Sequence, residues 1–72
     1  MDYPKITPKA ARVNAGLTQT VAAQLLNINV STLQNYENGA TVPPWNIVNE
    51  MSKIYKIGTD FINFNLKTAF SG

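Results

Sequence analysis

The sequence contains no cysteine and no histidine, and each absence excludes familiar kinds of site. Without cysteine, the chain forms neither a disulfide framework nor a thiolate metal centre. Without histidine, it lacks the commonest general base and the commonest metal ligand. The four carboxylates are scattered, without the paired spacing of an acid–base site, and no glycine-rich phosphate loop occurs. The sequence therefore predicts a protein that is not an enzyme and that binds no metal or cofactor.

Long apolar runs and charged residues are also scarce. No segment approaches the roughly 20 apolar residues of a membrane-spanning helix, and the N-terminal residues lack the apolar core of a secretory signal. We therefore expect a cytoplasmic protein without membrane contact. Charged residues make up 14% of the 72 residues, well below the usual ~25%. The surface must therefore be rich in Asn, Gln, Ser and Thr, around the modest core of one small domain.

Capping residues and apolar spacing predict five short helices and no strand. The first helix is expected to begin at Pro8 behind a Thr7 cap and to end at Gly16. Its expected inner residues are Ala10, Val13 and Leu17. Thr18 caps a second helix that extends to Leu26, and Asn27 suits a tight turn with positive φ. The apolar stripe of this second helix consists of Val21, Ala22, Leu25 and Leu26.

The remaining helices follow from the same kinds of residue. Asn29 is expected to cap a third helix, Val30 to about Asn38, which Gly39 closes and whose inner residues are Leu33 and Tyr36. A fourth helix is expected from about Trp45 to Tyr55, and its inward-facing candidates are Trp45, Val48, Met51, Ile54 and Tyr55. A fifth short helix is expected from Thr59 to about Phe64.

Residues 17–39, LTQTVAAQLLNINVSTLQNYENG, resemble the Cro/CI-type helix-turn-helix of phage and bacterial regulators, also called the XRE type. The similarity continues through Pro43 to Ile62 and covers most of the chain. The family positions are occupied without a gap by Thr18, Gln19, Ala23, Asn27, Asn29, Thr32, Leu33, Glu37, Asn38 and Gly39.

The resemblance implies an all-α, compact five-helix bundle of the lambda-repressor-like type, with the third helix as recognition helix. Its contact residues, for DNA or a protein partner, would be Asn29, Val30, Ser31, Gln34, Asn35 and Asn38. Thr18 and Gln19, at the start of the second helix, would contact a phosphate or the partner. Amide side chains suit bidentate contacts with adenine, and Val30 suits a thymine methyl group.

Charge is where the sequence departs from the family. Relatives often carry Lys or Arg near the positions of Val30 and Asn35, whereas this helix has none. Phosphate neutralisation supplies most non-specific DNA affinity. Lys5 and Lys9 are the basic contacts that we expect, and Lys53 or Lys56 is a further candidate. Lys56 stands where the family often has a glycine at the end of the fourth helix.

Two side chains have alternative interpretations. Arg12 is either a phosphate contact or, as the resemblance favours, the partner of Glu37 in a structural pair that ties the first helix to the third. Trp45 either stacks on a base or, as its apolar neighbourhood favours, lies in the core. The domain is expected to span residues 1–64, and the apolar tail, 65–72, is either an interface or a frayed end.

Two functions fit a chain of this kind. The first is a Cro-like repressor that binds operator double-stranded DNA directly, as a small homodimer. The second is a modulator of repression, or antirepressor, that binds the cognate CI-type phage repressor in a temperate-phage switch. The sequence favours the second, with shared DNA binding, because a neutral polar face avoids burying unpaired charge in a protein interface. Either function places the protein in the cytoplasm of a host bacterial cell.

Overall fold

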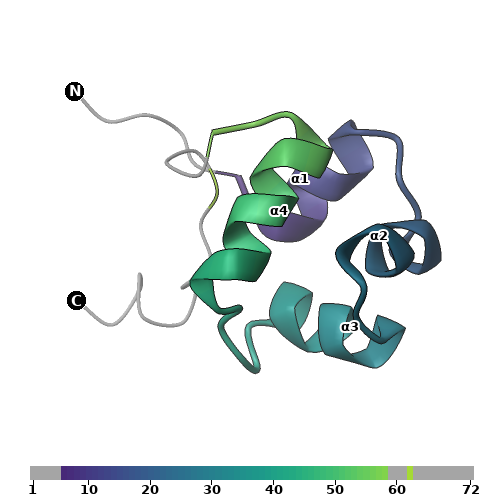
Figure 1. The fold of residues 1–72 in the computed structure, drawn as a ribbon, viewed down its shortest axis with the longest axis vertical. Helices are drawn as coiled ribbons and strands as arrows, with labels where there is room; N and C mark the ends of the chain where they lie inside the picture. Colours follow the sequence, from purple (N-terminus) through teal and green to yellow (C-terminus); the bar gives the residue numbers. More distant parts are fainter. Residues whose placement is uncertain (1–5, 59–61, 63–72) are drawn as a thin grey trace.

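The computed structural model describes residues 6–58 and residue 62, and it is built of helices (Figure 1). Helix α1 spans Pro8–Asn14, α2 Gln19–Leu26, α3 Val30–Asn38 and α4 Trp45–Tyr55. An isolated parallel bridge joins Ile6 to Ile62. The predicted all-helical class is confirmed for these residues. Within the fifth predicted helix, Thr59 to about Phe64, Ile62 alone is described, in that bridge, so the prediction of five helices is not confirmed. The tail 65–72 and Lys5 lie outside the described residues. None of the four described helices is long and apolar enough to cross a membrane.

Two turns depend on residues in the left-handed conformation. Asn27, at φ 58°, ends α2 as expected, and the N–H of Ile28 then bonds the carbonyl oxygen of Ala23 at 3.0 Å. Lys56 takes φ 57° at the end of α4. The hydroxyl of Ser52 donates to the carbonyl oxygen of Ile57 at 2.6 Å and supports that turn. Lys56 therefore adopts the conformation for which glycine is the usual choice.

The helix starts use local hydrogen bonds. The Thr7 hydroxyl oxygen accepts from the N–H of Ala10 at 3.0 Å, and that of Thr18 accepts from the N–H of Val21 at 3.2 Å. Both fill the N-cap role that the sequence predicts. Asn29 occupies the N-cap position of α3, but its side chain makes no capping hydrogen bond. The side-chain cap that the sequence predicts at Asn29 is therefore not formed.

All four helices pack around one core. Leu33 and Met51 are fully buried, and Ala22 and Ala23 let α2 approach its neighbours closely. Further buried apolar residues are Ala11, Leu26, Val48, Tyr55 and Ile62. The α4 prediction is confirmed for Val48, Met51 and Tyr55.

Three predicted inner faces were wrong in part. In α1, Ala11 is buried, whereas Ala10 is exposed and Val13 is 58% exposed. In α2, Val21 and Leu25 are 41% and 55% exposed. Both helices are short, so only a narrow stripe of each meets the core. Trp45 is 66% exposed, which contradicts its placement in the core. Trp45 is the first residue of α4 and directly follows the proline-containing loop. At this end of the helix its indole ring does not pack against the other helices.

Ala23→Leu is expected to destabilise the fold by about 1–3 kcal/mol, because added methylene groups force a packed core to shift. Ala23 is 3% exposed and lies where α2 crosses α3. Thermal unfolding followed by circular dichroism measures the effect. Exposed Gln24→Leu on the same helix is the matched control, and equal melting of the Ala23 variant and the parent would contradict the crossing.

Tyr55→Phe is expected to stabilise the chain. The Tyr55 side chain is buried, and its hydroxyl has no hydrogen-bond partner in the part of the chain that the structure describes. An unsatisfied buried polar group costs about 1–3 kcal/mol. A higher Tm for the phenylalanine variant at neutral pH is the expected result, and a lower one would contradict it.

The same hydroxyl makes the stability of the fold depend on pH. Burial raises the pKa of Tyr55 from 10.0 to about 12, the Glu37 carboxylate adds to the rise, and Arg12 opposes it. Above pH 10 the unfolded chain therefore releases the phenol proton while the folded chain keeps it. Stability consequently falls as pH rises from 10 towards 12. In urea unfolding over this range, the Tyr55→Phe variant should lose less stability than the parent.

Candidate functional site

Helices α2 and α3, joined through residues 27–29, form a helix-turn-helix (Figure 1). Ala22 and Ala23 are buried against the neighbouring helices, and Leu33, at 0% exposure, anchors α3 from its inner face. Because α3 is held from one side, its other side is left free. The fold therefore leaves the outer side of this short helix exposed.

The outer face of α3 is polar and uncharged. Its exposed residues are Asn29, Ser31, Gln34, Asn35 and Asn38. Val30 differs from the expectation, because it is half-buried and packs against the core. Amide and hydroxyl groups can both donate and accept hydrogen bonds. This face can therefore recognise a pattern of donors and acceptors but supplies no positive charge.

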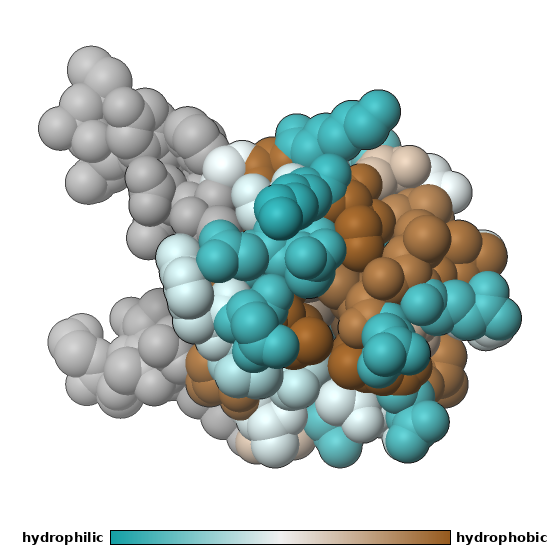
Figure 2. Space-filling view, viewed as in Figure 1, coloured by the Kyte–Doolittle hydropathy of each residue, from teal (hydrophilic) through white to brown (hydrophobic). Residues whose placement is uncertain are grey.

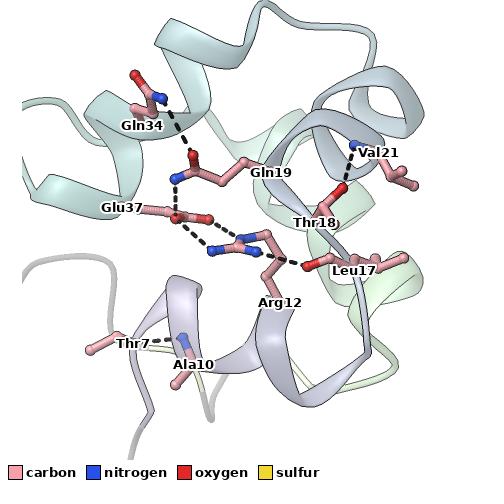
Figure 3. A network of polar contacts seen from close by, with 9 residues as sticks. All are labelled: Thr7, Ala10, Arg12, Leu17, Thr18, Gln19, Val21, Gln34 and Glu37. Carbon is pink, nitrogen blue, oxygen red and sulfur yellow. Dashed lines mark hydrogen bonds and ion pairs between the residues drawn. The ribbon is translucent and has the colours of Figure 1, made fainter.

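A buried ion pair lies behind this face (Figure 3). The Nε of Arg12 donates to Oε2 of Glu37 at 2.7 Å, and Nη2 donates to Oε1 at 3.3 Å. Nη1 donates to the carbonyl oxygen of Leu17 at 2.7 Å. Both residues are buried, at 7% and 8% exposure. Arg12 therefore ties α1 to α3 and to the start of the helix-turn-helix, and its guanidinium does not face a surface phosphate.

Gln19 links this pair to the surface. Its Nε2 donates to Oε1 of Glu37 at 3.0 Å, and its Oε1 accepts from Nε2 of Gln34 at 3.3 Å (Figure 3). Thr18, beside it, is occupied in part by its capping bond to Val21. The structure thus brings Arg12, Glu37, Gln19 and Gln34 into one hydrogen-bonded chain. All four were predicted as site residues, whereas the Gln19–Gln34 contact was not predicted, because the sequence holds no signal for it.

The basic residues lie elsewhere. No Lys or Arg occurs from residue 13 to residue 52. Lys9 is exposed, but it belongs to α1 and not to the helix-turn-helix. Lys53 lies 3.8 Å from the Glu50 carboxylate on the exposed side of α4. Neither α2, α3 nor the turn between them carries a cation.

Apolar side chains are exposed beside the helix-turn-helix. Figure 2 shows hydrophobic residues gathered over the side formed by the end of α1 and by α2. The exposed ones there are Val13, Val21 and Leu25. An open depression of ≈510 Å³ flanks the turn and is lined by Ala23, Gln24, Asn27, Ile28, Asn29 and Thr32. Five of the eight residues of α2 are apolar, which is more than one core-facing stripe holds, and this count was the available sequence signal.

Comparisons with known proteins agree with this geometry. The family model described as "Helix-turn-helix domain" matches residues 9–60. The HTH-type transcriptional regulator ImmR of Bacillus subtilis (strain 168) is 39% identical over 54 residues, which cover 75% of this chain. The chain spans 42% of the length of that relative. No solved structure matches the chain. The chain belongs to the Cro/CI-type (XRE) helix-turn-helix family.

Proposed function

We propose that the chain regulates transcription and that the outer face of α3 contacts double-stranded DNA. The observation that carries the proposal is the exposed row of amide and hydroxyl groups on a helix held from behind by the core. A recognition helix places such side chains, those of its N-terminal half first, against base edges in the major groove. The name of the Bacillus relative, a transcriptional regulator, is consistent with this role.

The chemistry of this face suits A·T-containing sites. Asn and Gln pair bidentately with adenine, and a hydroxyl serves several base edges. Gln34 and Asn35 are therefore proposed as base-reading residues, and Ser31 as an adaptable neighbour. Asn29 and Asn38 flank them at the two ends of the helix. The half-burial of Val30 leaves only part of that side chain for a thymine methyl group.

We propose that one copy of the chain binds DNA with low affinity. Each neutralised phosphate contributes about 0.9 to the slope of log affinity against log salt. Lys9 is the one exposed cation of the described N-terminal helices, and Lys5 precedes them in sequence. A homodimer on two half-sites would double the contacts without any added charge on α3.

The test is a selection of binding sites from a random duplex pool, followed by affinity measurements over a range of salt concentrations. We expect a selected sequence with adenine-rich positions and a salt slope of about −2 to −4. A steep slope together with no sequence preference would contradict base reading by α3.

A second candidate is an antirepressor, or modulator of repression, in a temperate-phage switch. In this case α3 and the exposed apolar residues of α2 dock onto the cognate CI-type repressor. The absence of Lys and Arg between residues 13 and 52 favours it, because a neutral face buries no unpaired charge in a protein interface. Exposed Val21 and Leu25 add apolar surface that DNA does not need.

Titration calorimetry against the DNA-binding domain of the cognate repressor, beside gel shifts with operator DNA, separates the two candidates. Specific DNA binding by the chain itself, with no repressor complex, supports the first. A repressor complex that prevents the repressor from binding its operator supports the second. Both candidate functions would act in the cytoplasm of a host bacterial cell.

A further inference from the structure

In the hydrogen-bonded chain of Arg12, Glu37, Gln19 and Gln34, the Glu37 carboxylate determines which group donates and which accepts at each contact. A carboxylate only accepts hydrogen bonds. Glu37 is buried and paired with Arg12 at 2.7 Å, and both of its carboxylate oxygens accept hydrogen bonds. Gln19 must therefore turn its NH2 group towards Glu37, as the 3.0 Å contact records. The opposite orientation would place the Gln19 carbonyl oxygen against a carboxylate oxygen.

The orientation of Gln19 fixes that of Gln34. With its NH2 group on Glu37, Gln19 directs its carbonyl oxygen at α3, where Gln34 donates from 3.3 Å. Gln34 must therefore use an N–H group inward. Its own carbonyl oxygen and its remaining N–H stay free on the exposed face (Figure 3). The usual ambiguity between the amide nitrogen and oxygen is thus removed by the buried carboxylate.

We propose that Glu37 is a positioning residue that acts through Gln19 to fix the amide orientation of Gln34, so that Gln34 distinguishes an A·T pair from T·A. This inference rests on the proposed DNA contact of α3. Adenine offers a donor at N6 and an acceptor at N7, in an order across the groove that reverses between the two pairs. A fixed carbonyl and N–H edge matches one order only. Guanine offers two acceptors and leaves the Gln34 carbonyl oxygen without a donor.

The first test is site selection with Gln19→Met beside the parent chain. The methionine keeps similar length and leaves the Arg12–Glu37 pair intact, but it releases Gln34 to rotate. At one position the parent should prefer A·T over T·A by about tenfold or more. The variant should bind both pairs within about twofold there, with unchanged preferences elsewhere. Gln24→Met, on the same helix and outside the hydrogen-bonded chain, is the control and should keep the parent preference. A retained preference in Gln19→Met overturns the proposal.

The second test needs no DNA. In Gln34→Glu, the new carboxylate faces the fixed carbonyl oxygen of Gln19, and only its protonated form can donate to it. Its pKa, from NMR titration, should therefore be higher than in Gln34→Glu combined with Gln19→Met. Glu37 is present in both proteins, so its charge cancels in the comparison.

The two tests separate the failures. Equal pKa values at position 34 overturn the orienting role, whatever the DNA results are. If the pKa at position 34 is raised but the parent protein selects no duplex, Glu37 and Gln19 still orient Gln34. The proposed function and the A·T discrimination are then both overturned.

Discussion

Glu37→Ala is expected to be the most damaging single substitution in the chain, with a loss of about 3–5 kcal/mol. The substitution leaves the Arg12 guanidinium, in a residue at 7% exposure, with the Leu17 carbonyl oxygen as its one remaining partner among the described residues. Gln19 loses its acceptor at the same time. A small domain has little stability to lose. Urea unfolding at neutral pH should therefore show a large unfolded population of this variant even without denaturant.

A double-mutant cycle checks the cause. Arg12→Ala should also destabilise strongly, and the two losses should be far from additive, because each removes the same interaction. Replacing both residues at once by Met at 12 and Leu at 37 should recover much of the stability, since apolar groups of similar size leave no unpaired charge. Fully additive losses, or a double replacement as unstable as Glu37→Ala, would contradict a coupled pair.

The second large effect is on binding. Gln34→Ala combined with Asn35→Ala is expected to weaken binding of the selected duplex by about 2–6 kcal/mol, because each bidentate contact contributes about 1–3 kcal/mol. Both side chains are exposed, so the Tm of the variant should stay near that of the parent. Fluorescence anisotropy with a labelled duplex gives the affinity, and circular dichroism gives the Tm.

Asn46→Ala, an exposed amide on α4, is the matched control and should bind like the parent. The same variants measured against the cognate repressor distinguish the two candidate functions. A loss confined to the repressor complex would favour the antirepressor. A double variant that binds both partners like the parent would contradict any role for the outer face of α3.

Local residues made much of this fold predictable. Thr7 and Thr18 cap helices through bonds to residues three positions ahead, and Asn27 and Gly39 take positive φ where the sequence places turns. Each of these interactions is decided within a few residues of the chain. The helix boundaries therefore follow closely from capping chemistry.

Contacts between residues far apart in the sequence limited what could be predicted from the sequence. The spacing of the five apolar residues of α2 cannot say which three of them face the core, because that depends on where α3 and α4 cross this helix. The exposure of Trp45 likewise depends on how the loop before α4 leaves the body of the protein. The Gln19–Gln34 contact joins two side chains that are 15 residues apart on different helices, and it needs both amide orientations at once. The Arg12–Glu37 pair came from family resemblance, since its members are 25 residues apart.

The central claim is that the outer face of α3 is the contact surface. It is tested most directly by NMR titration of the 15N-labelled chain with the selected duplex, and then with the cognate repressor. The account predicts that the largest changes fall on the side-chain amides of Gln34 and Asn35 and on the backbone N–H of Ser31, with α4 little affected. Changes centred on α4, with those α3 groups unmoved by either partner, would contradict it.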